Sequence, residues 1–221
     1  MKQYKIYLEE GKSLLERRLY GEALRELNKS ININRNCAEA YCKRGVALKK
    51  LRKDNYALQD FDKAISLDPN LGEAYFEKGL LLNKMGDSNL IQYLDLAIEK
   101  DPKLGKAYSY RGMHYYRARI YDKAYDDFNK ALELPDHSPK LYYYRGVILY
   151  LRGDIDNSFK DFNKAIELDP KWYEPYYARA VCYSKKGQKE LAVRDIEIYN
   201  RSKITSRSDY PWRQRHYSRP Y

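Results

Sequence analysis

The chain has 221 residues, of which 43% are hydrophobic and 33% charged, and this balance excludes a fully disordered polypeptide and favours a soluble folded one. Its formal net charge of +11 favours acidic or polyanionic partners without indicating a fold. The three cysteines lack the spacing of a disulfide framework or a zinc site, and no apolar run reaches the roughly 20 residues of a membrane span. We therefore expect a cytoplasmic protein with no membrane segment, no metal and no cofactor.

One short pattern, Tyr-x-x-[Arg/Lys]-Gly, recurs along the chain, with imperfect first and last copies. The small residue that ends each copy is Gly11, Gly45, Gly79, Gly112, Gly146 or Ala180, so successive copies are 34, 34, 33, 34 and 34 residues apart. A second pattern, Ala-x3-Phe-x2-Ala or a variant of it, follows at a fixed distance. A constant period of this length indicates a repeat architecture.

Each repeat is predicted to hold two helices, because its apolar and small residues recur at helical spacing in both halves. In chain order the repeats cover about residues 4–37, 38–71, 72–104, 105–138, 139–172 and 173–206, and residues 207–221 form a basic aromatic tail. An Asp-Pro pair such as Asp68-Pro69 ends most second helices, since the residue before a proline disfavours the helical conformation. The third repeat lacks one residue, and we expect a shorter turn near residues 86–89. In the fourth, Pro135 comes one place early.

These patterns resemble the tetratricopeptide repeat (TPR) family over roughly residues 4–206. The resemblance implies an all-α, right-handed superhelical solenoid of stacked hairpins and a role in binding other proteins rather than in catalysis. The small residue of each first pattern is expected where two helices approach closely. The Tyr and Phe rings are expected to fill the gaps beside it, and stacking of neighbouring hairpins completes the core.

A second regularity links the two helices of a repeat. Four repeats have Arg just before the small residue and Asp in the second helix, and the repeats without that Arg also lack the Asp. The predicted pairs are Arg44–Asp60, Arg111–Asp127, Arg145–Asp161 and Arg179–Asp195. This joint change predicts a contact between the helices, used for orientation rather than for ligand binding.

The family resemblance implies that the first helices line a concave groove that holds a peptide or partner segment. The groove positions with large or basic side chains are Phe76, Lys106, Tyr116, Lys140, Tyr143, Tyr150 and Tyr177. Such a surface suits an acidic or aromatic peptide, although the same rings could instead pack on neighbouring helices. A clamp for a C-terminal carboxylate is not expected, because Leu8, Lys12 and Lys43 stand where such a clamp needs Lys and Asn.

The tail alternates Arg with Tyr210, Trp212, Tyr217 and Tyr221, and three interpretations are open. It could contact single-stranded nucleic acid, cover the last hairpin or stay solvated. The first makes a nucleic-acid-associated TPR protein the alternative function, and self-association through the open ends of the array is a further alternative. No catalytic motif is present: His114 is expected to be a buried or half-buried structural residue, and His137 and His216 lie in a turn and in the tail.

Overall fold

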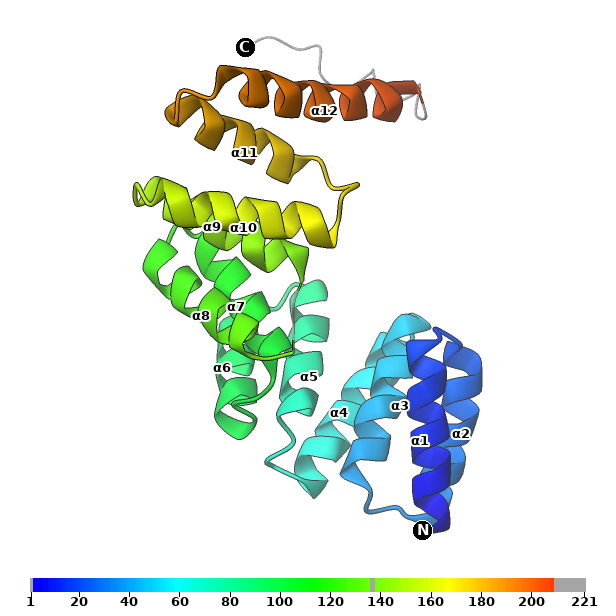
Figure 1. Ribbon diagram of the computed structural model, residues 1–221. Helices are drawn as coiled ribbons and strands as arrows, with labels where there is room; N and C mark the ends of the chain where they lie inside the picture. Colours follow the sequence, from blue (N-terminus) through cyan, green and yellow to red (C-terminus); the bar gives the residue numbers. More distant parts are fainter. Residues whose placement is uncertain (1, 136–137, 209–221) are drawn as a thin grey trace, which may run out of the picture. The chain divides into compact units, whose positions relative to one another are not determined.

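The computed structural model describes residues 2–135 and 138–208, and these residues form twelve helices and no strand (Figure 1). This confirms the predicted all-α class of stacked helical hairpins. The helices are α1 (Gln3–Glu16), α2 (Tyr20–Ile33), α3 (Ala38–Lys50), α4 (Asp54–Leu67), α5 (Gly72–Lys84), α6 (Leu90–Lys100), α7 (Gly105–Arg117), α8 (Tyr121–Glu133), α9 (Pro139–Leu151), α10 (Ile155–Leu168), α11 (Glu174–Lys185) and α12 (Lys189–Ser208). The first two residues of the predicted tail, 207 and 208, therefore belong to α12, and the rest of the tail lies outside the described residues.

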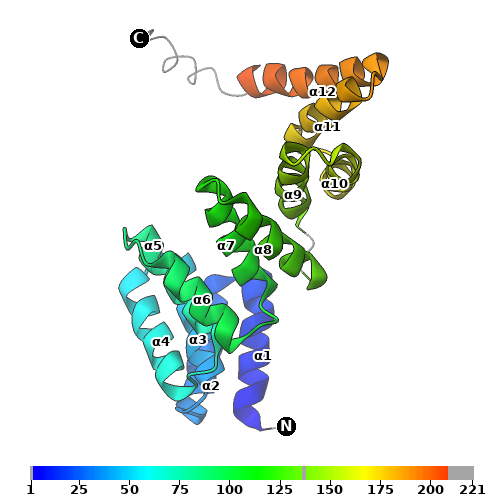
Figure 2. The ribbon, with the colours of Figure 1, turned by 90° about the vertical axis from the view of Figure 1, so that its left-hand side faces the viewer.

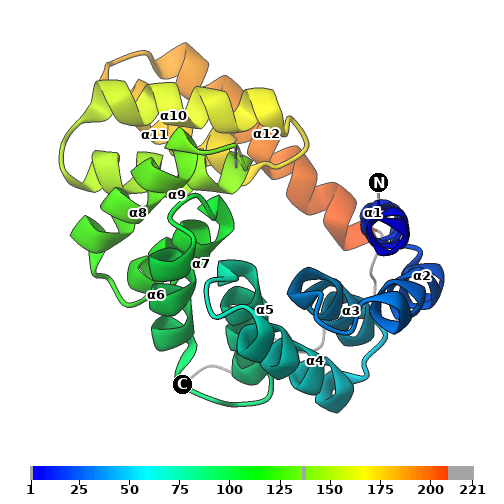
Figure 3. The same cartoon turned by 90° about the horizontal axis from the view of Figure 1, so that it is seen from below.

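The chain divides into two compact units, residues 1–114 and 115–221, with the boundary inside α7. In unit 1 the first helices α1, α3 and α5 contact one another in a row, and α2 and α4 each contact the first helix that follows (Figure 3). In unit 2, α9 contacts α11, and α10 packs against both of them (Figure 2). Each unit therefore has a row of first helices and a layer of second helices.

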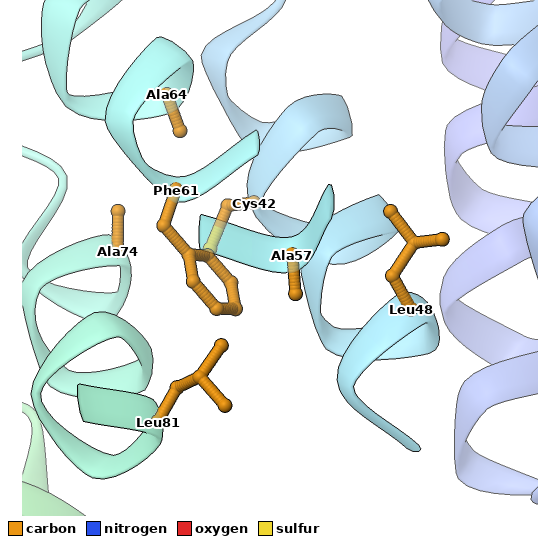
Figure 4. Close-up of a cluster of buried hydrophobic side chains, with 7 residues drawn as sticks. All are labelled: Cys42, Leu48, Ala57, Phe61, Ala64, Ala74 and Leu81. Atoms are coloured by element: carbon orange, nitrogen blue, oxygen red, sulfur yellow. The ribbon is translucent and has the colours of Figure 1, made fainter. Parts of the chain in front are cut away.

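In the second and fifth hairpins the core is built around a phenylalanine ring that lies over a glycine. In unit 1 the buried Phe61 of α4 points among Cys42, Ala74 and Leu81 (Figure 4). A Cβ atom on Gly45 would come within 2.6 Å of the Phe61 ring. In unit 2 a Cβ atom on Gly146 would come within 2.8 Å of the Phe162 ring. The predicted close approach of the two helices at the small residue is therefore confirmed at these positions.

The repeated tyrosines are less buried than the sequence suggests. Phe61 and Phe162 are fully buried, whereas Tyr41 and Tyr142 are half-buried. The guanidinium of Arg44 lies 5.2 Å from the ring centre of Tyr41, and that of Arg145 lies 5.7 Å from Tyr142. Tyr41 packs against two buried clusters, as expected, and an arginine also lies over the ring of each tyrosine.

Two kinds of turn join the helices. Between repeats, Asp68 and Asp101 follow the last residues of α4 and α6, and each carboxylate accepts a hydrogen bond at 3.0 Å from the backbone N–H two residues later. Such Asx turns mark the predicted helix ends before proline.

Within repeats, the turn between the two helices contains a residue with a positive φ angle. This residue is glycine in three repeats and arginine in the other three: Gly86, Gly153, Gly187, Arg18, Arg52 and Arg119.

The missing residue of the third repeat shortens a helix and not a turn. The connection from α5 to α6 spans residues 85–89, and α6 has 11 residues where α4 and α10 have 14. The predicted shorter turn near residues 86–89 is therefore wrong. The turn keeps its positive-φ Gly86, and Asp87 accepts a hydrogen bond from the Asn89 N–H at 2.7 Å, so the loss falls on the first turn of α6.

Candidate binding surface of the first helices

The predicted Arg–Asp contacts form a fixed geometry at three repeats. Arg145 donates from Nε to Asp161 at 2.8 Å and from Nη2 to its other oxygen at 2.7 Å. The same two bonds join Arg44 to Asp60 and Arg179 to Asp195. These aspartates are buried, so the planar guanidinium supplies the partners that their oxygens require.

Each of these arginines also reaches back to the preceding repeat. The Nη1 atom of Arg44 donates to Asn28 at 2.8 Å, that of Arg145 to Asn129 at 2.9 Å, and that of Arg179 to Asn163 at 2.8 Å. One arginine thus joins three helices, and we call this group an Arg–Asp–Asn link. Every residue of the link has a partner, which supports the structural interpretation over ligand binding. The fourth predicted pair, Arg111 with Asp127, stays a prediction because its residues belong to different units.

In unit 1 the first helices carry a row of ion pairs between successive repeats. Lys12 of α1 lies 3.0 Å from Glu39 of α3, and Lys43 of α3 lies 2.6 Å from Glu73 of α5. Lys49 of α3 pairs with Glu77 of α5. The hydrogen bond to Glu39 raises the pKa of Lys12. Burial lowers the pKa of Lys43, but its attraction and hydrogen bond to Glu73 outweigh that effect and leave the pKa raised.

This ion-pair row occupies the lysines that an incoming carboxylate would meet in unit 1. Lys12 and Lys43 already hold glutamates, and Leu8 is buried in the core. An incoming carboxylate would have to displace a paired glutamate before it gained a lysine. The absence of a carboxylate clamp stays a prediction.

In unit 2 the same surface is aromatic. Tyr116 of α7 lies 4.8 Å from Tyr144 of α9, measured between ring centres, and Tyr144 lies 5.1 Å from Tyr143. Tyr143 also lies 4.8 Å from Trp172, and Tyr177 of α11 lies 5.1 Å from Tyr199 of α12. We call Tyr116, Tyr143, Tyr144, Trp172 and Tyr177 the aromatic surface. Four of these rings are half-buried and Tyr177 is 51% exposed, so the surface offers ring faces on a rigid base.

The predicted groove residues take different places. Phe76 is 3% exposed and packs with Leu94, Ala97 and Ala107, so its ring belongs to the core of unit 1. The neighbouring Tyr110 is the exposed ring there, 5.3 Å from Phe76. The other predicted residues remain reachable from solvent: Lys106 and Lys140 are exposed, and Tyr116, Tyr143 and Tyr150 are half-buried.

Sequence reasoning missed two members of the aromatic surface. Tyr144 directly follows Tyr143, and counting one groove position per helical turn passed over it. Trp172 lies in the connection between α10 and α11, outside both helices. A search for aromatic residues beside the predicted groove positions, including connections, would have found both.

Tyr143 has the most perturbed environment of this surface. Burial is the main cause that raises its pKa to about 12, and the neighbouring Tyr116, Tyr144 and Glu174 add to the shift. The phenol therefore stays neutral and able to donate a hydrogen bond well above physiological pH. Burial also raises the pKa of Tyr116.

The remaining predictions concern the histidines, metal binding, membrane spans and self-association. His114 is exposed, so the expectation of a buried histidine is wrong, while His137 and His216 lie outside the described residues. Among the described residues, no group of His, Cys, Asp and Glu is arranged to hold a metal ion. None of the described helices combines the length and apolarity that a bilayer crossing requires. At the end of the array α12 leaves Val193 and Ile196 exposed, which is the kind of surface on which the self-association alternative rests.

Family models agree with the repeat assignment. Two tetratricopeptide repeat models match the chain, one at residues 38–71 and 139–171 and the other at residues 61–93 and 162–194. Together with twelve helices paired as hairpins, these matches show that the chain belongs to the tetratricopeptide repeat family. Proteins of this family are in general repeat scaffolds for protein–protein interaction. No curated protein matches the sequence.

Solved structures support the same fold. The structure of pilF from Pseudomonas aeruginosa aligns with a TM-score of 0.76 at 16% identity, over 95% of this chain and 92% of that one. YrrB, described as a TPR protein with an unusual peptide-binding site, aligns with a TM-score of 0.63 at 22% identity, over 78% of this chain and 90% of that one. MamA aligns with a TM-score of 0.53 at 26% identity, over 73% of this chain and 95% of that one.

Proposed function

We propose that the chain is a scaffold or adaptor that binds an extended peptide or partner segment on the aromatic surface of unit 2. The observation that carries this proposal is the contiguous series of rings from Tyr116 through Tyr144 and Tyr143 to Trp172, with neighbouring ring centres 4.8–5.1 Å apart. Tyr and Trp are the residues that most often provide binding energy at protein interfaces, because they bury large areas at little cost in side-chain entropy. The peptide-binding site named for YrrB is consistent with this use of the fold.

The chemistry of the partner follows from the flanking charges. Lys140 is exposed at the start of α9, whereas the corresponding place of α11 holds the carboxylate of Glu174. An aromatic or proline-containing segment of the partner packs well against the rings. An acidic residue at the end of the segment that lies toward Lys140 can pair with that lysine. Unit 1 is the less favourable half, since its ion-pair row must open before a charged ligand can bind.

The test is a selection of displayed random peptides on the full chain, followed by calorimetric titration of the selected sequences. Tyr177→Ala removes the most exposed ring of the surface and should weaken binding by about 1–2 kcal/mol. Tyr143→Phe is a better probe of the centre than Tyr143→Ala, because the ring of Tyr143 also packs against Phe162 at 6.0 Å.

Tyr56→Ala is the matched control, because Tyr56 of α4 is equally accessible, with 62% of it exposed, and lies in unit 1. The affinity of the Tyr56→Ala variant for the selected peptides should stay within about twofold of wild type, a difference well below 1 kcal/mol. Peptides that bind the Tyr177→Ala variant as tightly as wild type, and lose affinity in the Tyr56→Ala variant, would contradict the proposed location.

A further inference from the structure

The turns inside the repeats contain an unexpected choice of residue. All six turns place a positive φ angle at the same position, and three of them use glycine, which adopts it without cost. Arg18, Arg52 and Arg119 hold it at φ angles of 60°, 63° and 60°. Arginine has no side-chain group that favours this conformation locally, so each of these residues is strained relative to glycine. The strain alone does not assign a role to these arginines, so the surroundings of each one decide it.

Two of these arginines lie in unit 1, at the ends of successive hairpins, within a basic edge. This basic edge consists of Arg17, Arg18, Lys50, Arg52 and Lys53, all of them exposed. Within the described part of the chain, none of the five forms an ion pair. Glu16 and Glu22 flank the first turn, and Asp54 beside the second is held by Lys84 at 2.8 Å, so positive charge remains in excess.

Stabilisation of helix ends explains only part of this edge. Cations near the last turn of a helix interact favourably with its dipole, which accounts for Lys50 at the end of α3. Arg52 lies beyond the end of that helix and has a positive φ angle, which is less favourable for an arginine than for a glycine. A glycine would make the same turn at lower cost.

Beside the second turn the outer side of unit 1 has a recess of about 380 Å³. Asn28 of α2, Arg44 of α3 and Gln59 of α4 line it, together with Lys53 of the basic edge. Tyr56 stands at the same recess with 62% of its surface exposed, which is unusual for so large an aromatic side chain. Lys53, the exposed ring of Tyr56 and the amide of Gln59 thus lie at one recess, where Arg44 and Asp60 are already paired with each other.

We propose that the basic edge and recess of unit 1 bind single-stranded nucleic acid. Arg18, Arg52 and Lys53 contact successive phosphates, while a base stacks on Tyr56 and its edge meets the amide of Gln59. Stacking on an exposed ring flanked by cations is the general mode of single-strand recognition. A duplex keeps its base faces covered, so the ring favours a single strand. The residues of this site differ from those of the basic tail and of the aromatic surface.

The test uses the full chain and a fluorescein-labelled RNA oligonucleotide of mixed sequence and about 12 nucleotides, within the usual site size. Fluorescence anisotropy gives Kd over a series of salt concentrations. The double variant Arg18→Gly/Arg52→Gly removes both guanidinium groups while relieving the strained turns. We expect at least about tenfold weaker binding near 0.1 M salt and a salt slope lowered by about 1.4, which is 0.7 for each lost phosphate contact. Tyr56→Ala should weaken binding about tenfold and leave the slope unchanged.

The chain offers matched controls for each change. Arg119→Gly removes the same residue from the same kind of strained turn in unit 2, and Tyr177→Ala removes an exposed ring of the aromatic surface. Both should change Kd by less than about twofold. Because glycine suits the turn, the thermal midpoint of Arg18→Gly/Arg52→Gly should be no lower than that of wild type. Weakened RNA binding in this variant then reflects lost contacts and not lost folding.

Four results would overturn the proposal. The first is no RNA binding at low salt, and the second is equal losses in Arg52→Gly and Arg119→Gly variants, which would indicate charge without a site. The third is a full chain that binds anionic vesicles but not RNA, which would assign the basic edge to a membrane surface. A triple variant in the tail, Arg213→Gln/Arg215→Gln/Arg219→Gln, should cause a smaller loss than the double glycine variant. The reverse order would place binding in the tail.

Discussion

At the residue scale, Gly45 and Gly146 and the phenylalanine rings opposite them determine how closely their hairpins close. Gly146→Ala would place a methyl group 2.8 Å from Phe162, whose ring is buried and has no space to move into. We expect a net loss of about 1–2 kcal/mol in the free energy of unfolding, after a gain of about 1 kcal/mol in helix propensity. Urea unfolding measures this difference.

Gly21→Ala is the control for that substitution. Gly21 lies in α2 and a Cβ atom there would meet nothing within 4 Å. The same chemical change should therefore stabilise the protein by about 0.5–1 kcal/mol. A loss of stability at both glycines would show that close helix contact is not the reason for Gly146.

The ionisation of Tyr143 makes stability depend on alkaline pH. Its pKa in the folded chain is raised, chiefly by burial, from the ordinary 10.0 to about 12. The unfolded chain therefore ionises first. The contribution of neutral Tyr143 is complete below pH 10 and is lost as the pH rises toward 12. We expect absorbance titration to resolve one tyrosine ionising near pH 12, and Tyr143→Phe to remove that component. A curve unchanged by the substitution would contradict the burial of this phenol.

Single residues also show where sequence reasoning was sufficient. The joint occurrence of Arg and Asp predicted the contact between Arg145 and Asp161 without a structure. The contact of Arg145 with Asn129 was not predicted, because only pairs of residues within one repeat were considered. An asparagine nevertheless stands at the same place before each linked arginine. Half-burial of Tyr142 could not be predicted from its pattern, since period and residue type do not report which ring face an arginine covers.

At the element scale, the Arg–Asp–Asn links hold three of the second helices, α4, α10 and α12. Asp161 is 5% exposed and accepts two bonds from Arg145. Asp161→Asn replaces one acceptor with a donor that faces the guanidinium and leaves the half-buried arginine without its counter-charge. We expect a loss of about 2–3 kcal/mol in the free energy of unfolding.

Asp122→Asn provides the comparison for that variant. Asp122 of α8 also pairs with an arginine, Arg152, at 2.5 Å, but its side chain is 91% exposed. An exposed pair contributes little, so this substitution should change stability by less than about 0.5 kcal/mol. Equal losses in the two variants would mean that burial of the link is unimportant.

Helix positions and helix ends followed from sequence to a large extent, because proline, glycine and the repeat period act locally. The shortening of α6 could not be predicted from the sequence. A one-residue deletion can shorten either a turn or a helix, and packing determines which of the two is shortened. Phe76 shows the same limit for the candidate site. Its position matches the groove, but the neighbouring Leu94 and Ala97 leave space that its ring fills.

At the scale of the whole molecule, the third repeat is the weakest place among the hairpins of unit 1. Lys78 stands where the second repeat has Arg44, and it bonds to Asp62 of α4 at 2.6 Å without a partner aspartate on α6. Its own second helix supplies Tyr93 instead, 5.5 Å from the ammonium group. Together with the lost first turn of α6, this leaves the hairpin with fewer interactions to hold it closed.

Native-state hydrogen exchange should therefore reveal local opening of α5–α6. We expect amides of α6 to exchange faster than those of α4, whose second-helix position is held by the link through Arg44 and Asp60. In the variant Asp60→Asn the exchange of α4 should rise toward that of α6. Slower exchange in α6 than in α4 would contradict this order of stability.

The Arg–Asp–Asn link has a consequence for how such a chain can change in length. Arg145 bonds to Asn129 and Arg179 bonds to Asn163, so the residue that each repeat requires from its predecessor is the same. If the codons for residues 139–172 were deleted, Arg179 would lie opposite Asn129. Arg179 would keep Asp195 as its partner in the second helix. Insertions and deletions of one full period thus preserve the junction without compensating mutations, and the repeat is the natural step of variation in this protein.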